Sequence, residues 1–196
     1  MNRYGVTLAA DLYKPKGVQG KLPALAVSGP FGAVKEQASG LYAQEMATRG
    51  FLAIAVDRSF TGESGGQPRR GAAPGINTED FCAAVDYLSC RDDVDPERIG
   101  IIGICGFGGM AINAAALDPR IKATAAMTMY DMSHVTREGY FGSSDNKEAR
   151  DEQRRAWAAQ RTADYKAGEY TRAGGVVDPL PDDAPQFVRD YHDYYK

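Results

Sequence analysis

The stretch Ile99-Gly-Ile-Ile-Gly-Ile-Cys105-Gly-Phe-Gly-Gly-Met-Ala-Ile-Asn-Ala-Ala-Ala-Leu117 decides the fold of this chain. Its first part, residues 99–104, is an unbroken apolar run of the kind that forms a fully buried parallel strand. The run passes directly into Cys105, then into glycines, then into a helical segment of small residues. The pattern predicts a reactive thiol on a tight strand-to-helix turn. We expect the helix N-terminus behind it to favour negative charge and to lower the thiol pKa.

The bulk composition sets the class of protein. A chain of 196 residues suits one domain with a sizeable core, and 43% hydrophobic with 25% charged residues is ordinary for a soluble globular protein. A net charge of −3 and the lack of a long apolar run favour neither a nucleic-acid partner nor a membrane partner. Three cysteines (Cys82, Cys90 and Cys105) without metal-type spacing indicate reduced thiols and a cytoplasmic protein.

Apolar runs and helical patterns alternate along residues 1–131. Strands are expected at residues 6–8, 11–13, 23–27, 51–56, 99–104 and 121–129. Helices are expected at residues 41–49, from an N-cap at Thr78 to about residue 89, and from the turn at Cys105 to residue 117. Residues 95–98 are expected to form a turn into the strand that follows. The alternation predicts an α/β fold, with a mostly parallel sheet and flanking helices joined by right-handed crossovers.

The character of the chain changes after Asp131. Residues 147–166 form a charged helical pattern around Trp157, residues 173–185 are irregular, and residues 187–195 form a short aromatic helix. No further buried strand is expected there. We therefore divide the chain into a core at residues 1–131 and a helical part at residues 132–196.

Several motifs carry a resemblance to a known superfamily. The turn reads Gly103-Ile-Cys-Gly-Phe-Gly-Gly109, and other matching stretches are Asn2-Arg-Tyr-Gly5, Val34-Lys-Glu-Gln37, Gly62-Glu-Ser-Gly-Gly66, Asp118-Pro-Arg-Ile121 and residues 173–179. With them the chain resembles the α/β-hydrolase superfamily, near its dienelactone-hydrolase-like and Xaa-Pro-peptidase-like members, in a bacterial group with this glycine-rich elbow. The resemblance implies an α/β-hydrolase fold that is incomplete at its C-terminal side. It also implies that residues 132–196 are a lid-like insertion; the alternative is a solvated helix with Trp157 packed inward.

The resemblance also implies an activity and a nucleophile. The implied reaction is hydrolysis of an ester, lactone or related acyl bond of a small molecule, with neither a metal nor an organic cofactor. Cys105 would be the nucleophile, and Gly103 fills the small position two residues before it. Phe107 departs from the pattern, because the usual elbow has glycine there and this chain has its glycines one residue late. The alternative is that Cys105 is a small buried hydrophobe.

Two backbone N–H groups are expected to hold the oxyanion. One belongs to Gly106, the residue after the nucleophile, and the other to Phe31, in the loop after the first buried strand. Pro30 has no N–H to offer. The alternative for this segment is an ordinary strand-to-helix loop.

The remaining catalytic groups are not evident in the sequence. The hydrolase pattern places an acid and then a histidine after later strands, but only His134 and His192 follow Cys105, and both are expected at the surface. The resemblance implies that the strands for those groups lie beyond Lys196. A catalytically silent, truncated hydrolase-like scaffold or ligand-binding protein is therefore the alternative function. The strand at residues 121–129 would then be an exposed edge through which the protein self-associates.

Other residues carry weaker signals. Asp57 and Asp131 follow strands at the same sheet edge, and Glu63 and Ser64 lie in the loop after Asp57; for each, a structural and a catalytic role are equally open. Residues 106–111 also satisfy the dinucleotide fingerprint G-x-G-x-x-A. That fingerprint normally follows the first strand of its sheet, whereas other strands come first here.

Overall fold

The computed structural model describes residues 1–143, 146–172 and 178–195. These residues fall into two compact units, Met1–Met132 and Ser133–Lys196. Most of the motif at residues 173–179 lies outside the described residues.

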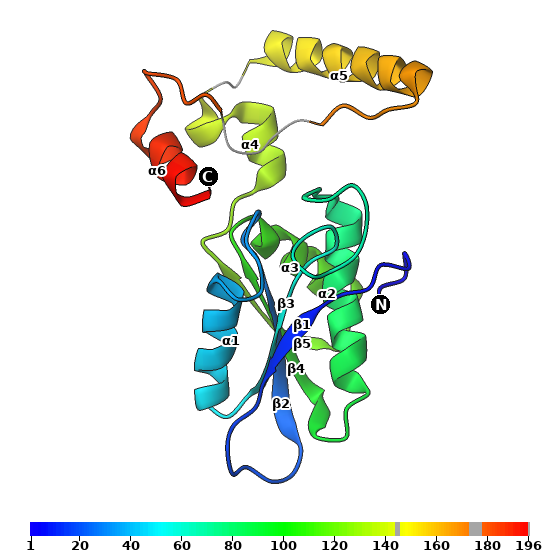
Figure 1. The fold of residues 1–196 in the computed structure, drawn as a ribbon, viewed down its shortest axis with the longest axis vertical. Coiled ribbons are helices and arrows are strands. Elements are labelled where there is room, and N and C mark those ends of the chain that lie inside the picture. The colour runs from blue at the N-terminus through cyan, green and yellow to red at the C-terminus, as the bar shows by residue number, and fades with distance from the viewer. Residues whose placement is uncertain (144–145, 173–177, 196) are drawn as a thin grey trace. The chain divides into compact units, whose positions relative to one another are not determined.

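The first unit is built on a five-stranded sheet (Figure 1). The strands are β1 (Ala10–Tyr13), β2 (Leu22–Ser28), β3 (Leu52–Val56), β4 (Val94–Ile104) and β5 (Ile121–Met127), in the order β1-β3-β2-β4-β5. β1 runs antiparallel to β3, and the other neighbours are parallel. The connecting helices are α1 (Ala38–Thr48), α2 (Pro74–Ser89) and α3 (Gly106–Leu117). The predicted mostly parallel sheet with flanking helices is confirmed.

Helices cover the two faces of the sheet (Figure 1). Successive side chains of a strand point to opposite faces, so Ala24 and Ala26 of β2 pack with α2 and α3, while Leu25 and Val27 pack with α1. Because each central strand is buried on both faces, it reads as a continuous apolar run rather than an alternating one.

The strand order places a topological switch point between β2 and β4. The connection after β2 leads to β3 on one side, and the connection after β4 leads to β5 on the other side. At such a switch point the loops that follow the two strands diverge, and ligands bind outside the carboxyl ends of the strands. The loop after β2 carries Phe31, and the turn after β4 carries Cys105. The topology therefore brings the two predicted site segments to the same edge.

Some of the local predictions are wrong. Residues 6–8 do not form a strand, because they bond to the loop after β3 instead: the Gly65 N–H donates to the Thr7 carbonyl, and the Ala9 N–H to the Ser64 hydroxyl. Thr78 does not cap α2, which begins one turn earlier. Pro74 stands at the first helical position, where its missing N–H costs nothing.

Other boundaries shift by a few residues. β4 begins at Val94, so residues 95–98 belong to the strand rather than to a turn, and its register with β2 shifts around Pro96, which has no N–H to donate. β5 ends at Met127, not at residue 129, and forms one edge of the described sheet. Self-association through this edge stays a prediction.

The second unit contains helices among its described residues. They are α4 (Met132–Glu138, which starts at the last residue of the first unit), the short helix η1 (Tyr140–Gly142), α5 (Lys147–Ala167) and α6 (Gln186–Tyr195). Asn146 caps α5 by accepting from the Ala149 N–H, and Gly168 ends it in the left-handed conformation. Trp157 is 51% exposed rather than packed inward, since α5 buries only Asp164. Within the described residues, no helix combines the length and apolar character of a membrane span.

The close packing of α3 on β4 can be tested by replacing one glycine inside the contact and one outside it. A Cβ at Gly103 would lie 2.2 Å from the Phe107 carbonyl oxygen and 2.7 Å from the Ala111 Cβ, whereas a Cβ at Gly109 would meet nothing nearer than 4.0 Å. We expect Gly103→Ala to lower the free energy of unfolding by about 1–3 kcal/mol, because α3 must move away from the strand. Gly109→Ala should be neutral or stabilising by up to about 1 kcal/mol, through helix propensity. Urea denaturation of both variants checks this, and equal effects would contradict the close crossing.

Candidate active site

Cys105 occupies the sharp turn between β4 and α3. Its backbone has φ 59° and ψ −129°, a conformation that costs a residue with a Cβ about 1–3 kcal/mol. Neighbouring backbone holds it there: the Cys105 N–H donates to the Met127 carbonyl oxygen at 2.8 Å, and the Gly108 N–H donates to the Cys105 carbonyl oxygen at 2.9 Å. Cys105 is therefore pinned between the end of β5 and the first turn of α3.

The loop after β2 packs directly on this turn. A Cβ at Gly106 would lie 2.0 Å from the Phe31 ring, and a Cβ at Gly29 would lie 2.4 Å from the Ile104 carbonyl oxygen. Both glycines are buried, so the contact leaves no room for a side chain at either position. The missing side chains are what allow the loop to reach the thiol.

The three residues predicted for the site lie together. The backbone N–H groups of Gly106 and Phe31 lie close enough to the half-buried thiol of Cys105 to favour its thiolate. Burial raises the pKa of this thiol above its ordinary value, and the two N–H groups offset only part of that rise. The lowered pKa expected from the helix N-terminus is therefore wrong for this chain, because removing the sulfur from water outweighs the donors around it.

Phe107 fits the turn because its side chain points into the core. The residue is fully buried, and its ring lies 5.1 Å from the Phe31 ring, edge to face, and 6.3 Å from the Phe81 ring. Only the backbone of Phe107 meets Gly103. A large residue two positions after Cys105 is therefore compatible with the close crossing of strand and helix.

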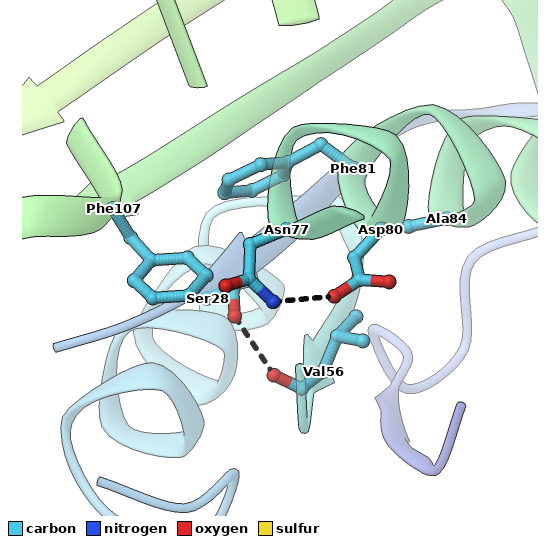
Figure 2. Close-up of a pocket in the computed structure, with 7 residues that line it drawn as sticks. All are labelled: Ser28, Val56, Asn77, Asp80, Phe81, Ala84 and Phe107. Carbon is cyan, nitrogen blue, oxygen red and sulfur yellow. Dashed lines mark hydrogen bonds between the residues drawn. The ribbon is translucent and has the colours of Figure 1, made fainter. Parts of the chain in front are cut away.

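A small cavity lies beside Phe107 (Figure 2). Its volume of about 10 Å³ is room for about one water molecule. The Ser28 hydroxyl donates to the Val56 carbonyl oxygen, and the Asn77 amide donates to the Asp80 carboxylate at 3.1 Å. Asp80 also accepts from Asn2, which ties the start of the chain to α2. The cavity is too small for a substrate.

Asp57 joins the loops that follow β2 and β3. Its carboxylate accepts the Lys35 N–H at 2.7 Å and the Glu63 N–H at 2.9 Å, and so joins the loop after β2 to the loop after β3. The Ser64 hydroxyl donates to the Asp57 carbonyl oxygen. These contacts favour the structural interpretation of Asp57 and Ser64. Asp131 is exposed just before α4.

Both histidines lie in the second unit. His134 is exposed on α4, as predicted, with Nε2 3.4 Å from a Glu138 carboxylate oxygen. His192 on α6 is half-buried, with Nδ1 3.3 Å from Asp193. The first unit, which holds Cys105, contains no histidine. Nor does the described part of the chain contain a group of three or more His, Cys, Asp or Glu side chains that could hold a metal ion.

The dinucleotide fingerprint at residues 106–111 opens α3. In a nucleotide-binding loop the glycines let the pyrophosphate approach the backbone closely. Here the Phe31 ring covers Gly106, where that approach would take place. This packing argues against a pyrophosphate at this turn.

Two buried cations near the site were missed by the sequence analysis. Lys35 is 4% exposed and pairs with Glu63 at 2.9 Å, with Glu36, and with Asp11 at 3.7 Å, contacts that raise its pKa. Arg58 is 4% exposed and contacts the loop that carries Phe31. The only signal for Arg58 was its place after the strand-end Asp57, at the predicted ligand edge.

The raised pKa of Cys105 predicts its pattern of alkylation. Only the thiolate attacks iodoacetamide, so a thiol with a raised pKa holds less reactive form at neutral pH and gains it as the pH rises. We expect the rate at Cys105, followed by mass spectrometry, to reach half its maximum at higher pH than for N-acetylcysteine. A midpoint below that of N-acetylcysteine would show that the donors outweigh burial.

Most of the chain matches a known family. The model for the X-Pro dipeptidyl-peptidase (S15 family) matches residues 4–190. The uncharacterized protein PA2218 of Pseudomonas aeruginosa is 55% identical over 195 residues, which are 99% of this chain and 52% of the relative. The crystal structure of PA2218 superposes with a TM-score of 0.88, over 99% of this chain and 60% of that one.

More distant proteins agree on the fold. The α/β hydrolase GrgF from Penicillium sp. sh18 has a TM-score of 0.72 at 22% identity, over 91% of this chain and 57% of that chain. The thiohydrolase aneE of Aspergillus aculeatus is 36% identical over 100 residues, which are 51% of this chain and 31% of the relative. The predicted α/β-hydrolase fold is confirmed. The chain spans about half the length of the relative PA2218.

Proposed function

This chain belongs to the X-Pro dipeptidyl-peptidase (S15) family, and we propose that within it Cys105 is the nucleophile of a hydrolase that cleaves an ester, lactone or thioester of a small molecule. The single observation that carries the proposal is the convergence of two backbone N–H groups, from Phe31 and Gly106, on the Cys105 sulfur. One donor lies in the loop after β2, and the other is the first residue of α3. Two such donors beside a nucleophile are the arrangement that stabilises a developing oxyanion.

The proposed reaction runs through an acyl-enzyme. The sulfur of Cys105 attacks the carbonyl carbon, and the thiol proton passes to a base. The carbonyl oxygen becomes an oxyanion and accepts hydrogen bonds from the Phe31 and Gly106 N–H groups. Collapse expels the alcohol or thiol, which takes up a proton and leaves the acyl group on the sulfur. Water then attacks this thioester, releasing the free acid and restoring the thiol.

A thioester is the acyl bond best matched to this nucleophile. Attack by a thiol on a thioester exchanges one thioester for another, so the first step neither gains nor loses much free energy. One relative, 36% identical over about half of this chain, is named a thiohydrolase, which supports the same substrate class.

The nucleophile can be tested without its base. Histidine usually accepts the proton in such reactions, and the first unit has none. Above the pKa of the thiol, however, the sulfur is already ionised and attacks directly. Acylation at alkaline pH therefore isolates the roles of Cys105 and its two donors from the identity of the base.

The first test is acyl capture. The chain is mixed briefly with p-nitrophenyl acetate or S-phenyl thioacetate at a pH above the midpoint of iodoacetamide labelling at Cys105, quenched in acid and mapped by mass spectrometry. We expect one acetyl group on Cys105, formed at least tenfold faster than on N-acetylcysteine at matched thiolate concentration, because the two N–H donors stabilise the transition state.

Matched cysteine variants provide the controls. Cys90→Ala removes an exposed thiol and Cys82→Ala a half-buried one, and neither should alter acetylation of Cys105. Cys105→Ala should abolish the rapid phase. Acetylation of Cys105 no faster than that of N-acetylcysteine would contradict the proposal and favour a catalytically silent, hydrolase-like scaffold.

A further inference from the structure

Arg58 clamps the loop that carries the Phe31 donor. It lies two residues after the end of β3 and is 4% exposed. Its Nη1 donates to the Pro30 carbonyl oxygen and to the Ala33 carbonyl oxygen, each at 3.2 Å. These two carbonyls stand on either side of Phe31 in the chain. One guanidinium nitrogen thereby closes the loop around the residue whose N–H reaches the thiol.

The same guanidinium packs against both segments that carry donors. Its central carbon lies 5.8 Å from the centre of the Phe31 ring and 5.0 Å from the centre of the Phe107 ring. Phe31 belongs to the loop after β2, and Phe107 follows Gly106 on α3. A cation over an aromatic face attracts it more strongly when water is excluded. Arg58 therefore ties the two donor segments to each other.

The chemistry of the side chain suits this task. A buried charge is costly unless fixed dipoles surround it, so the guanidinium favours one arrangement of the loop over looser ones. Its planar shape allows hydrogen bonding at the edge and stacking on the face at once, which the lysine ammonium does not reproduce.

We propose that Arg58 is a positioning residue that holds the Phe31 N–H against the Cys105 sulfur. A catalytic role for Arg58 rests on the function proposed above, whereas the effect of Arg58 on the Cys105 thiol does not. The assignment also accounts for Phe107, since a glycine there would remove one of the two rings on which the guanidinium packs.

The test compares two arginine variants of the full chain. Arg58→Lys keeps the buried charge but loses the planar group. Arg49→Lys is the control, because Arg49 also donates to a backbone carbonyl, that of Glu45 at 2.7 Å, but is exposed at the end of α1. The rate of iodoacetamide labelling at Cys105 is measured by mass spectrometry as a function of pH. Loss of the Phe31 donor should raise the midpoint by about one pH unit in Arg58→Lys, which is a tenfold smaller thiolate fraction near neutrality, and should leave Arg49→Lys unchanged.

The same experiment also gives the result that would overturn the proposal. A merely structural Arg58 would lower the melting temperature of Arg58→Lys without moving the midpoint, and that result overturns the proposal. Hydrogen exchange of the wild-type chain gives a second check should Arg58→Lys not fold. The Phe31 amide should exchange at least tenfold more slowly than the exposed amide of Gly17, and equal rates would also overturn the proposal.

Because alkylation needs no substrate, the two proposals fail separately. A raised midpoint in Arg58→Lys together with no rapid acetylation of wild-type Cys105 would remove the proposed function and keep the positioning role. Rapid acetylation of Cys105 with an unchanged labelling midpoint in Arg58→Lys would keep the proposed function and remove the positioning role of Arg58.

Discussion

The close approach of α3 to β4 at Gly103 is the constraint on which the site depends. With no side chain at Gly103, the backbone of Phe107 can lie against the strand, and the chain must turn within one residue. That residue is Cys105, which adopts a positive φ at a cost of about 1–3 kcal/mol. The strain is tolerated because β5 and the first turn of α3 both hydrogen-bond to the Cys105 backbone. The thiol is thereby presented at the carboxyl edge of the sheet.

Opposing electrostatic effects act on that thiol. Burial disfavours the thiolate, while the N–H groups of Phe31 and Gly106 favour it, and burial prevails in the pKa of Cys105. In the proposed reaction the same N–H groups would stabilise the oxyanion, which forms only in the transition state, more than they stabilise the resting sulfur. Asp57 and Arg58 hold the surrounding loops through backbone N–H and carbonyl groups respectively. The proposed catalysis therefore relies on fixed backbone dipoles rather than on a lowered thiol pKa.

Much of this architecture was predictable because it follows local rules. The apolar run ending at Ile104 and the small residues after Cys105 predicted the strand, turn and helix. The resemblance to α/β-hydrolases predicted that the N–H groups of Phe31 and Gly106 would lie beside the thiol. The rest depends on contacts distant in sequence. The pKa of Cys105 is raised by packing that no local sequence pattern indicates. Arg58 contacts the loop at Pro30 and Ala33, and Lys35 pairs with Asp11, so each contact joins residues more than twenty positions apart. The start of α2 was misplaced because Thr78 looked like a cap while Pro74 supplied the first turn.

The most direct measurement of the central claim is a crystal structure of the chain bearing an aldehyde or trifluoromethyl ketone on Cys105. Such an adduct carries an oxygen where the oxyanion would form. The account predicts that this oxygen lies within about 2.7–3.1 Å of the backbone nitrogens of both Phe31 and Gly106. An adduct whose oxygen points away from these two nitrogens, or a Cys105 that remains unmodified while Cys90 reacts, would contradict it.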